Sequence, residues 1–540
     1  MTVHFSSAGP VTGESFYNRE GELRRLLYAA RDLKAGIKRY YALIGMRKVG
    51  KTSVLREFAR LVEADRKIVT TIIDCNEACV SPTSFFSEYV VRVIDAYLMK
   101  SGTAKKTGLL AGAALDDAQY LTVAANVKAL GLNSLGHGID VLFALARPLA
   151  EAQHKATCVA AADLPESIGQ ESGLFFVVIL DEFQRAASLN GFKETKRVVG
   201  DIFAFLRSRW QGHSMVNYWI SGSEISLMEQ ILNREASPFF QQFATMRVAS
   251  FSDSASRKLL IDLFEKSNYS VSQDLIQKMV ELTGGNPFYL QVMGEELCKN
   301  AVDKDPDVNT LKTTLQEVLF NPGGRLYSYC EALFSGTVRS SSSLERTLAA
   351  IASKHQRPTA ISRKLRIPVG TANSYLVRLI DLDLIKKTDT SYDFVDPLFR
   401  LWVAGTKTPL KSMISPYTLG TETEKLVAER LSREGFYVLF APASRGAFDL
   451  LAILNSTHVG VQVKRSSRDS YYLSQEAYQR MVQTSRKLRW FPALAIVSPD
   501  MPQVRYFPLE RLQRSRKAYR MDETTESYST LSELVFSGAA

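Results

Sequence analysis

Unbroken apolar runs that end in glycine or polar residues recur in the first half of the chain. The first run covers Tyr40 to Ile44, the second covers Phe175 to Leu180, and the third, within MVNYWISGS, ends at Ser221-Gly-Ser223. Continuous runs of this length, as opposed to alternating ones, are typical of strands in a parallel sheet that is covered on both faces. The pattern therefore predicts an α/β domain with a parallel sheet in the N-terminal part.

The hydrophobic period changes after the first run. Leu55, Phe58 and Leu61 fall on one face of a predicted helix, and the segment GMRKVGKT lies between the run and this helix. G-x4-G-K-T is the spacing of a phosphate loop, in which glycines let backbone N–H groups point at phosphate oxygens and the helix adds its positive end. We expect nucleotide contacts from Gly45, Val49, Gly50, Lys51, Thr52 and Ser53.

The chemistry of such a loop assigns roles to residues at the ends of the runs. Lys51 is expected to reach the β- and γ-phosphates of ATP, and Thr52 is expected to bind Mg²⁺. The second run ends at Asp181-Glu182, where Asp181 would hold Mg²⁺ through water and Glu182 would polarise the attacking water, which marks a hydrolase. Ser221 is the predicted sensor of the γ-phosphate, although the sequence does not distinguish it from Ser223.

The middle of the chain has helical runs that begin near Ser343, Thr359 and Val369, followed by a short β-prone pair after Ile385. This order resembles a winged helix–turn–helix, a fold that places its second helix in the DNA major groove. An internal packing or regulatory role is the alternative. The side chains expected on the DNA-facing surface are Thr371, Asn373, Ser374 and Arg378, with Arg357, Arg363, Lys364 and Arg366 as phosphate contacts.

Two apolar runs near the end of the chain carry polar residues where a core is expected. Asp449 stands in AFDLLAIL, Gln462 and Lys464 close HVGVQVK, and Glu424 lies on a helix that precedes both runs. Strand alternation places Gln462 and Lys464 on one face. Because unpartnered buried polar groups are costly, we expect these side chains to converge on one point. Carboxylate and amide oxygens there would hold a divalent cation, and Lys464 would orient water or stabilise charge on phosphorus.

The N-terminal part resembles the archaeal-type ATPases of the AAA+/STAND group. The likeness rests on SFYNREGELRRLL, the phosphate loop, ILDEFQ, ISGS and LTGGNPFYLQ, from about Gly13 to Leu297. It implies that Tyr17, Asn18 and Arg19 lie by the adenine and that Pro287 contacts the nucleotide from a helical lid. The chain departs from the group at Gln241-Gln242, where relatives often carry an arginine. Arg234 and Arg247 are therefore only candidates for an arginine finger.

The C-terminal part resembles the PD-(D/E)xK nuclease superfamily, and within it the archaeal Holliday-junction resolvases and the Mrr-type restriction endonucleases. The likeness covers about Gly420 to Ser498 and includes Glu424, Ser444, Asp449 and the Gln-x-Lys pair. It implies Glu424, Asp449 and Gln462 as ligands of Mg²⁺, with Mn²⁺ as an alternative, and Lys464 as a catalytic residue. Resolvases usually carry glutamate at the position of Gln462, so one negative ligand is missing and metal affinity should fall.

Composition supports a nucleic-acid partner and an intracellular setting. The chain has 67 lysines and arginines against 56 acidic residues, and the part from Gly405 onward holds 19 basic and 13 acidic ones. A basic balance suggests a polyanionic partner such as DNA, while a solubilising surface is the alternative. Five cysteines without paired spacing favour buried thiols in a reducing cytoplasm. We expect neither a signal peptide nor a membrane span, because charged residues interrupt the apolar stretch from Gly108 to Ala146.

These features predict an α/β chain of several domains. We expect a P-loop ATPase core over 1–235 with a helical insertion at about 100–173, a helical lid over 236–325, a winged helix over 326–404, a linker over 405–419 and a nuclease-like domain over 420–540. The predicted function is ATP hydrolysis that regulates cleavage of duplex or branched DNA by a homo-oligomer. The alternatives are a DNA-binding motor or loader that does not cleave, and a defence or signalling NTPase with a nuclease effector.

Overall fold

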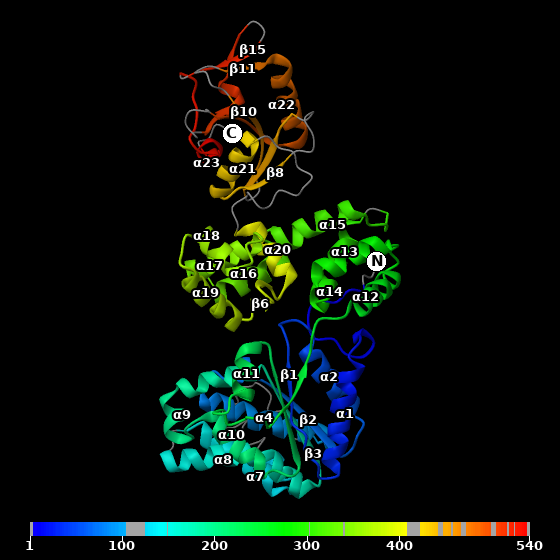
Figure 1. Ribbon diagram of the computed structural model, residues 1–540. Helices are drawn as coiled ribbons and strands as arrows, with labels where there is room; N and C mark the ends of the chain where they lie inside the picture. Colours follow the sequence, from blue (N-terminus) through cyan, green and yellow to red (C-terminus); the bar gives the residue numbers. More distant parts are fainter. Residues whose placement is uncertain are drawn as a thin grey trace. The chain divides into compact units, whose positions relative to one another are not determined.

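The computed structural model describes residues 4–103, 125–147, 150–301, 303–338, 341–407, 422–440, 447–454, 457–465, 471–497, 504–515, 518–522 and 524–536. The chain forms two compact units. Figure 1 labels the helices and strands along the chain. The first comprises Met1–Leu344 and Arg357–Phe399, and the second comprises Glu345–Gln356 and Arg400–Ala540. Within the described residues, each unit contains a five-stranded sheet of its own.

The first unit is built around a parallel sheet with the strand order β2-β3-β4-β1-β5. The three predicted apolar runs are strands β1, β3 and β4, and all three are parallel, as expected. Strand β4 lies between β1 and β3, so its end stands between the phosphate loop and the acidic pair. The strands are β1 (Tyr41–Ile44), β2 (Ile68–Asp74), β3 (Phe175–Asp181), β4 (Val216–Gly222) and β5 (Ala244–Arg247).

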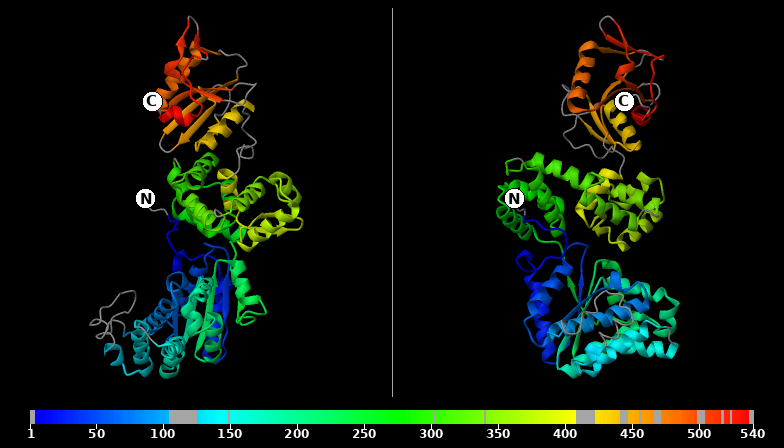
Figure 2. Two further views of the ribbon diagram at one scale, coloured as in Figure 1. Left: turned by 90° about the vertical axis from the view of Figure 1, so that its left-hand side faces the viewer. Right: turned by 180° about the vertical axis from the view of Figure 1, so that it is seen from behind.

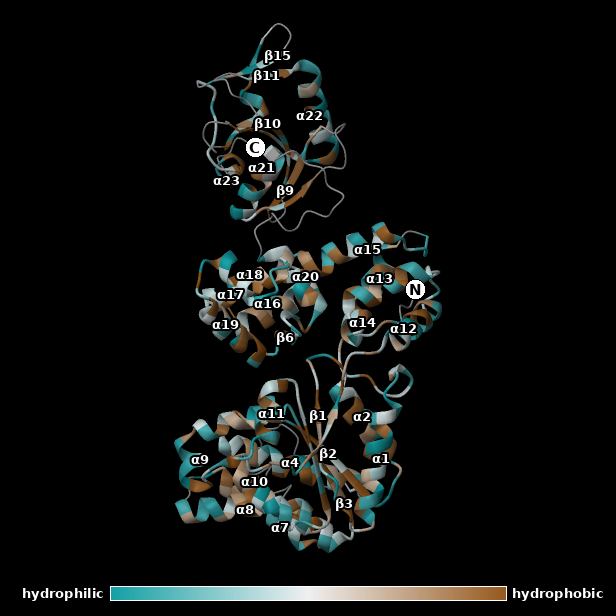
Figure 3. Cartoon of the chain, viewed as in Figure 1, coloured by the Kyte–Doolittle hydropathy of each residue, from teal (hydrophilic) through white to brown (hydrophobic). Residues whose placement is uncertain are grey.

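The alternating side chains of β3 face two separate cores. Phe176, Val178 and Leu180 belong to one hydrophobic cluster, and Val177 and Ile179 belong to the other. Helices cover both faces of the sheet, and its interior is apolar (Figures 1, 2 and 3). The helices are α1 (Glu20–Lys34) and α2 (Lys51–Val62) on the face of Val177, and α4 (Pro82–Lys100), α7 (Asn133–Leu145), α8 (Glu151–Ser172) and α10 (Ile202–Gly212) on the other.

Helix α2 corrects one part of the predicted hydrophobic pattern. Leu55 and Phe58 are fully buried, but Leu61 is 40% exposed and Val62 takes its place in the core. A step of three residues turns 300° around a helix, so a second step of three moves Leu61 further from the buried face. The spacing from Leu55 to Val62 brings the side chain back to that face.

The predicted helical insertion is helical where the structure describes it. Helices α7 and α8 lie within the range 100–173 and pack against α4 and against each other. Residues 104–124, which include much of the apolar stretch after Gly108, lie outside the described residues. The shorter elements of the ATPase-like part are η1 (Gly13–Ser15), α3 (Cys75–Ala78), η2 (Phe183–Gly191), α9 (Lys193–Val198) and α11 (Ile225–Asn233).

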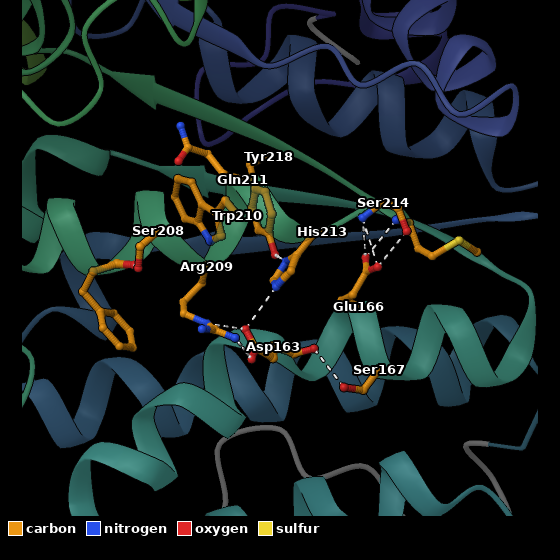
Figure 4. A network of polar contacts seen from close by, with 12 residues as sticks. Asp163, Glu166, Ser167, Ser208, Arg209, Trp210, Gln211, His213, Ser214 and Tyr218 are labelled. Atoms are coloured by element: carbon orange, nitrogen blue, oxygen red, sulfur yellow. Dashed lines mark hydrogen bonds and ion pairs between the residues drawn. The ribbon is translucent and has the colours of Figure 1, made fainter.

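A network of polar contacts joins α8 to the start of β4 (Figure 4). The Glu166 carboxylate accepts hydrogen bonds from the backbone N–H groups of Ser214, at 3.0 Å, and Met215, at 2.8 Å. Burial raises the pKa of Glu166, but these N–H donors, together with the Ser214 hydroxyl and the Gln170 amide, outweigh burial and hold the pKa below its usual value. Glu166 therefore fastens α8 to the segment that leads into β4.

The same network continues through Asp163, which precedes Glu166 by one turn of α8. Asp163 pairs with Arg209 and lies 3.0 Å from Nε2 of His213, whose Nδ1 lies 2.8 Å from the buried hydroxyl of Tyr218 (Figure 4). Both ring nitrogens of the buried imidazole therefore have a partner. These contacts lie at the end of the sheet opposite the phosphate loop, because β4 runs from Val216 to Gly222.

Further helical segments and a two-stranded hairpin complete the first unit. Helix α19 packs on α18 and is followed by the antiparallel pair β6 and β7, so two packed helices and a hairpin stand where the winged helix is predicted. The bounds are α12 (Asp253–Lys266), α13 (Gln273–Thr283), α14 (Pro287–Asn300), α15 (Val308–Leu315), η3 (Gln316–Phe320), α16 (Arg325–Thr337), α18 (Pro358–Leu365), α19 (Val369–Asp381), β6 (Ile385–Thr388) and β7 (Ser391–Phe394). Helices α17 (Ser342–Ala352) and α20 (Pro397–Thr406) each span a boundary between the two units.

The second unit contains a mixed sheet with the strand order β13-β12-β10-β9-β8 and a smaller antiparallel sheet with the order β11-β15-β14. Strands β8, β9 and β10 form an antiparallel meander, and β12 joins β10 in parallel after α22. The helices are α21 (Glu422–Arg433), α22 (Gln475–Leu488) and α23 (Leu531–Phe536), with the short η5 (Leu509–Arg511). The strands are β8 (Tyr437–Phe440), β9 (Leu450–Leu454), β10 (Thr457–Arg465), β11 (Tyr471–Ser474), β12 (Phe491–Val497), β13 (Val504–Pro508), β14 (Gln513–Arg514) and β15 (Ala518–Met521).

The structure bears on two further features of the sequence, the cysteines and the apolar helices. All five cysteines, at positions 75, 79, 158, 298 and 330, are buried with free thiols. Among the helices that the structure describes, none is both long enough and apolar enough to cross a lipid bilayer.

Candidate functional sites

The phosphate loop occupies the turn between β1 and α2, as its sequence predicts. A Cβ atom at Gly45 would lie 2.1 Å from the carbonyl oxygen of Val248, so only glycine fits there. Gly50 has a φ of 97° and immediately precedes α2, and Lys48 also has a left-handed backbone with a φ of 65°. The loop conformation is therefore set by close backbone approach at its first glycine and by positive φ angles near its end.

Lys51 is folded into this loop. Its side chain is 4% exposed, and its ammonium donates to the carbonyl oxygens of Gly45 and Met46, both at 2.9 Å. Burial lowers the pKa of Lys51, against the opposing effect of the Glu182 and Asp181 carboxylates. A desolvated cation held by carbonyl dipoles is stabilised further by an anionic ligand, which fits a phosphate group.

The acidic pair at the end of β3 is surrounded by hydroxyl and amide donors. Asp181 accepts from the Thr52 hydroxyl at 2.7 Å and also from the Ser221 hydroxyl. Thr52 and Asp181, the two residues predicted to serve Mg²⁺, are thus in direct contact, and their oxygen atoms suit a hard cation. Ser221 is fully buried, and its hydroxyl is engaged with Asp181.

The neighbouring Glu182 has a separate set of partners. Its Oε2 accepts from the hydroxyl of Ser223 and from the amide of Gln184. Glu182 also has a φ of 52°, a left-handed conformation that is uncommon outside glycine. Sequence reasoning left the choice between Ser221 and Ser223 open. In the structure Ser223 contacts Glu182 and lines the adjoining cavity.

A cavity of about 530 Å³ opens beside the phosphate loop. Tyr17, Arg19 and Pro287, three of the residues predicted to contact the nucleotide, line it, as does Ser53. Asn18, Gly45, Asp181 and Ser221 are not among the described residues that line it. The wall contains Ser6, Ser7, Gly9, Pro10, Val11, Ser15, Phe16, Tyr17, Arg19, Arg47, Lys48, Val49, Gly50, Lys51, Thr52, Ser53, Asn76, Glu182, Arg185, Ser223, Phe251, Leu259, Pro287, Phe288, Gln291 and Tyr329.

Two residues of the N-terminal motif support this cavity in different ways. Arg19 is 8% exposed, donates to the carbonyl oxygen of Val49 at 3.1 Å and lies 4.8 Å from the centroid of the Phe251 ring. It therefore fixes the phosphate loop. The Tyr17 hydroxyl is buried without a hydrogen-bond partner among the described residues, and burial raises the pKa of Tyr17. Such a buried polar atom in the wall fits a polar ligand.

An N-terminal strap, residues 4–13, joins helices α12 and α14 to the helix of the phosphate loop. Phe5 packs against Phe264, with ring centroids 4.9 Å apart, and against Gly294, where a Cβ atom would lie 2.0 Å from the Phe5 ring. At the other end of the strap, Val11 donates its N–H to the Ser53 hydroxyl at 3.1 Å. The strap also supplies part of the cavity wall, so its two anchors and the cavity are physically connected.

The polar residues of the second unit lie around the start of β9 and the end of β10. Asp449 accepts the N–H of Val463 at 2.7 Å and the side-chain N–H of Gln462. Burial raises the pKa of Asp449, opposed by the Val463 N–H and by the charge of Lys464. Gln462 is 9% exposed and Lys464 is half-buried, whereas Val463 belongs to the core on the other face of β10. The predicted alternation is therefore present.

The other two residues predicted for this site are Glu424 and Ser444. Glu424 is half-buried on α21, a helix that packs against β8, β9 and β10. Ser444 lies outside the described residues. Within the described part of the chain, no group of three or more His, Cys, Asp or Glu side chains is arranged to hold a metal ion. The two carboxylates and the amide of Gln462 still offer the oxygen atoms that Mg²⁺ and Mn²⁺ prefer.

Some residues beside these sites were not found from the sequence. Gln184 ends the ILDEFQ motif and Arg185 follows it, but sequence reasoning gave neither a role, because their contacts depend on the turn after β3. Tyr471 on β11 is influenced by this cluster, because burial and then the charge of Asp449 raise its pKa. Spacing cannot reveal Tyr471, because its strand pairs with β15, which lies much further along the chain.

The fold and the first site define a P-loop ATPase. Residues 16–293 match the family described as an ATPase domain predominantly from Archaea, and the chain belongs to this family. Residues 415–539 match the archaeal Holliday junction resolvase family. The protein is therefore an archaeal-type ATPase domain fused to a resolvase-like domain. No curated protein matches the chain.

Solved structures resemble each part of the chain. A Walker-type ATPase of Pyrococcus abyssi is 22% identical, with a TM-score of 0.52, and the match covers 74% of this chain and 99% of that chain. This likeness supports the fold of the ATPase part. The Holliday junction resolvase of Archaeoglobus fulgidus is 24% identical over 22% of this chain and 95% of its own, with a TM-score of 0.20. The ORC2 protein of Aeropyrum pernix is 12% identical over 74% of this chain and 96% of its own, with a TM-score of 0.45.

Proposed function

We propose that this protein binds and hydrolyses MgATP and uses the nucleotide to regulate a metal-dependent DNA endonuclease in its C-terminal unit. The branched junction is the proposed substrate, because the C-terminal residues match a resolvase family. The observation that carries the nuclease part is the convergence of the Gln462 amide and the Val463 N–H on the Asp449 carboxylate, next to Lys464. This is the polar cluster that an apolar strand pair would otherwise exclude.

In the ATPase part, the chain's own groups bind and orient the nucleotide. Backbone N–H groups of the phosphate loop and the desolvated Lys51 hold the phosphates, and Thr52 with Asp181 would hold Mg²⁺. The metal supplies charge neutralisation at the phosphate oxygens. Glu182 accepts the proton of the attacking water once Ser223 and Gln184 release its carboxylate.

In the nuclease part, Glu424 and Asp449 would hold Mg²⁺ or Mn²⁺, with Gln462 as a neutral ligand. A bound cation supplies an acidic water and polarises the scissile phosphate. Burial raises the pKa of Asp449, so the protein alone stabilises the charged carboxylate poorly and a cation would favour it. Lys464 would steer the water or neutralise charge that develops on the phosphate.

DNA contact is proposed for the helix–turn–helix as well. Asn373, Ser374 and Arg378 on α19 are exposed, as are the basic residues of α18. The far end of α19 has another role, because Asp383, two residues beyond it, accepts the hydroxyl of Ser226 at 2.7 Å and the N–H of Ser226 at 3.0 Å. The same helix that would contact DNA is thereby fastened to α11, which begins shortly after the serine pair at the end of β4. This connection supports control of DNA contact by the nucleotide.

The test is cleavage of a synthetic four-way junction and of the matching linear duplex in Mn²⁺, with and without ATP. We expect incision of the junction by the full chain and its loss in Lys464→Ala. Cleavage that runs equally without nucleotide and in Lys51→Ala would refute regulation by ATP. Junction binding without any incision would instead favour the second candidate, a DNA-binding loader that does not cleave. The neutral Gln462 in place of a carboxylate is the observation that favours this candidate.

A further inference from the structure

Arg185 is placed beside the acidic pair by the turn that follows β3. It is the third residue of η2, and its N–H donates to the carbonyl oxygen of Glu182 at 2.9 Å. Glu182 is the residue immediately before η2, so Glu182 and Arg185 belong to the same backbone turn. Both side chains line the nucleotide cavity.

The contacts that hold the Arg185 guanidinium are weak enough to exchange. Its Nε donates to Oδ1 of Asn76 at 3.1 Å, and its terminal nitrogen lies 3.8 Å from Oε1 of Glu224. A terminal nitrogen of Arg47 in the phosphate loop lies 3.6 Å from the same Glu224 oxygen. The Arg185 side chain is 48% exposed and that of Glu224 is 36% exposed, so the ion pair is largely screened by water. One carboxylate shared by two guanidiniums leaves a surplus positive charge.

The positive charge around the cavity favours a phosphate group as the new partner of the Arg185 guanidinium. The described wall of the cavity carries five cationic side chains, and Glu182 is the one carboxylate among them. Three of these cations are engaged elsewhere: Arg19 with the Val49 carbonyl, Lys51 with the loop carbonyls, and Lys48 over the Phe288 ring at 5.0 Å. Arg185 is the cation that shares a turn with Glu182, where water must attack.

The arginines considered from the sequence stand elsewhere. Arg247 forms an ion pair with Glu229 on α11, and Arg234 is exposed just after the same helix. Neither belongs to the described cavity wall. An arginine that reaches across from a second copy of the chain is therefore not required to supply positive charge near Glu182.

We propose that Arg185 is a catalytic arginine that acts within its own chain on the γ-phosphate of ATP. This inference rests on the proposed ATPase activity. In hydrolysis the oxygen of water bonds to the γ-phosphorus while the bond to the β,γ-bridging oxygen breaks and ADP leaves. The water proton passes to Glu182 and then to solvent. Arg185 leaves Glu224 and neutralises charge on the γ-phosphate oxygens, as arginines do in other phosphoryl transfers.

The experiment compares the full chain with Arg185→Ala, Arg185→Lys and, as matched arginine controls, Arg234→Ala and Arg247→Ala. We expect Arg185→Ala to lower kcat for ATP about a hundredfold to a thousandfold, with little change in KM, because one charge-stabilising donor is lost. Arg185→Lys keeps the positive charge but loses the paired N–H donors of the guanidinium, so its kcat should lie between those of the wild type and Arg185→Ala. The two control variants should retain wild-type kcat. An unchanged kcat in a folded Arg185→Ala protein would overturn the proposal.

A binding measurement gives a readout that does not depend on turnover. Retention of ADP with aluminium fluoride, which imitates the transferring phosphoryl group, should be strong in the wild type and lost in Arg185→Ala, while ADP alone binds both equally. Equal retention by both proteins would contradict a role at the γ-phosphate. Wild-type protein that neither hydrolyses ATP nor retains the analogue would refute the proposed ATPase activity itself.

Mixing two inactive variants separates action within one chain from action between chains. Lys51→Ala keeps Arg185 but loses the phosphate ligand, and Arg185→Ala keeps the nucleotide site. If Arg185 acts within its own chain, a mixture of the two proteins stays inactive at every concentration. Recovery of ATP hydrolysis in the mixture would mean that Arg185 serves a neighbouring copy, and the proposal would be wrong on that point.

Discussion

Lys51 in the first unit and Lys464 in the second unit stand in very different surroundings. Lys51 is almost completely buried, and backbone carbonyls of the phosphate loop hold its ammonium in place. Lys464 is half-buried near a carboxylate whose pKa is raised by burial. The nucleotide site is built mainly from backbone geometry, whereas the second site depends on side chains from a helix and two strands. The first site is therefore held in place before any ligand binds, whereas the members of the second site would be drawn together only by the proposed cation.

Asp449→Asn tests the second site most severely. We expect junction cleavage to fall by at least about a hundredfold, because a neutral amide replaces a metal-binding carboxylate. DNA binding in a gel-shift assay should be unchanged, since phosphate contacts dominate affinity. Cleavage that persists at the wild-type rate in Asp449→Asn would show that this cluster is not the active centre.

Lys51→Ala tests the first site. Removing the buried ammonium should weaken ATP binding about 10- to 100-fold, which is the loss expected for charge-assisted hydrogen bonds to phosphate. Calorimetric titration with ATP and Mg²⁺ measures the effect. Lys48→Ala serves as the control from the same loop, because Lys48 lies over Phe288 and is expected to cause a smaller loss. Equal losses in the two variants would contradict a special role for Lys51.

Gln462→Glu sharpens the comparison by adding the carboxylate that resolvases usually carry. Without a divalent ion, the introduced carboxylate would face that of Asp449 in place of the present N–H donor, so Tm should fall. With Mn²⁺ present, the Tm of Gln462→Glu should instead exceed that of the wild type. The Mn²⁺ concentration needed for half-maximal cleavage should fall about tenfold in the variant, because the charge of the ligands sets cation affinity. If Mn²⁺ changed the Tm of neither protein, the result would argue against a cation at this position.

Glu166→Gln tests a region away from both sites and should have the smallest effect on activity. The Glu166 pKa is held below its usual value by N–H donors, so its contribution to stability is present above about pH 4.5. It is lost as pH falls through the lowered pKa. We expect the free energy of unfolding of the variant to be about 1–3 kcal/mol lower than that of the wild type at pH 7, and this difference to become smaller at acid pH. Urea unfolding at several pH values measures it.

The sequence predicted the first site more fully than the second. The phosphate loop, β1, β3 and β4 could be placed from their residues, because glycine spacing and unbroken apolar runs act over a few neighbours. The partners of Glu182 could not, because Gln184 and Ser223 meet it only after the left-handed turn at Glu182. Leu61 was misplaced because helical phase drifts over two steps of three residues. The assigned roles of the site residues remain predictions.

In the second unit the sequence predicted which strands carry polar groups and the face they occupy. It did not predict that Gln462 donates its amide N–H to Asp449, because an amide can offer either its nitrogen or its oxygen to a neighbour. Tyr471 was missed for a different reason. Its strand, β11, belongs to the second sheet and pairs with β15, near position 520. Pairing between strands so far apart in the sequence produces no pattern among neighbouring residues.

The N-terminal strap has a practical consequence for anyone who purifies this protein. Phe5 packs against α12 and α14, and the N–H of Val11 is hydrogen-bonded to the helix of the phosphate loop, so residues 4–13 connect the two sides of the nucleotide cavity. Deletion of residues 4–13 would remove both anchors and part of the cavity wall, so nucleotide affinity should fall. Measured nucleotide affinities should therefore be compared only between preparations that carry the same N-terminus.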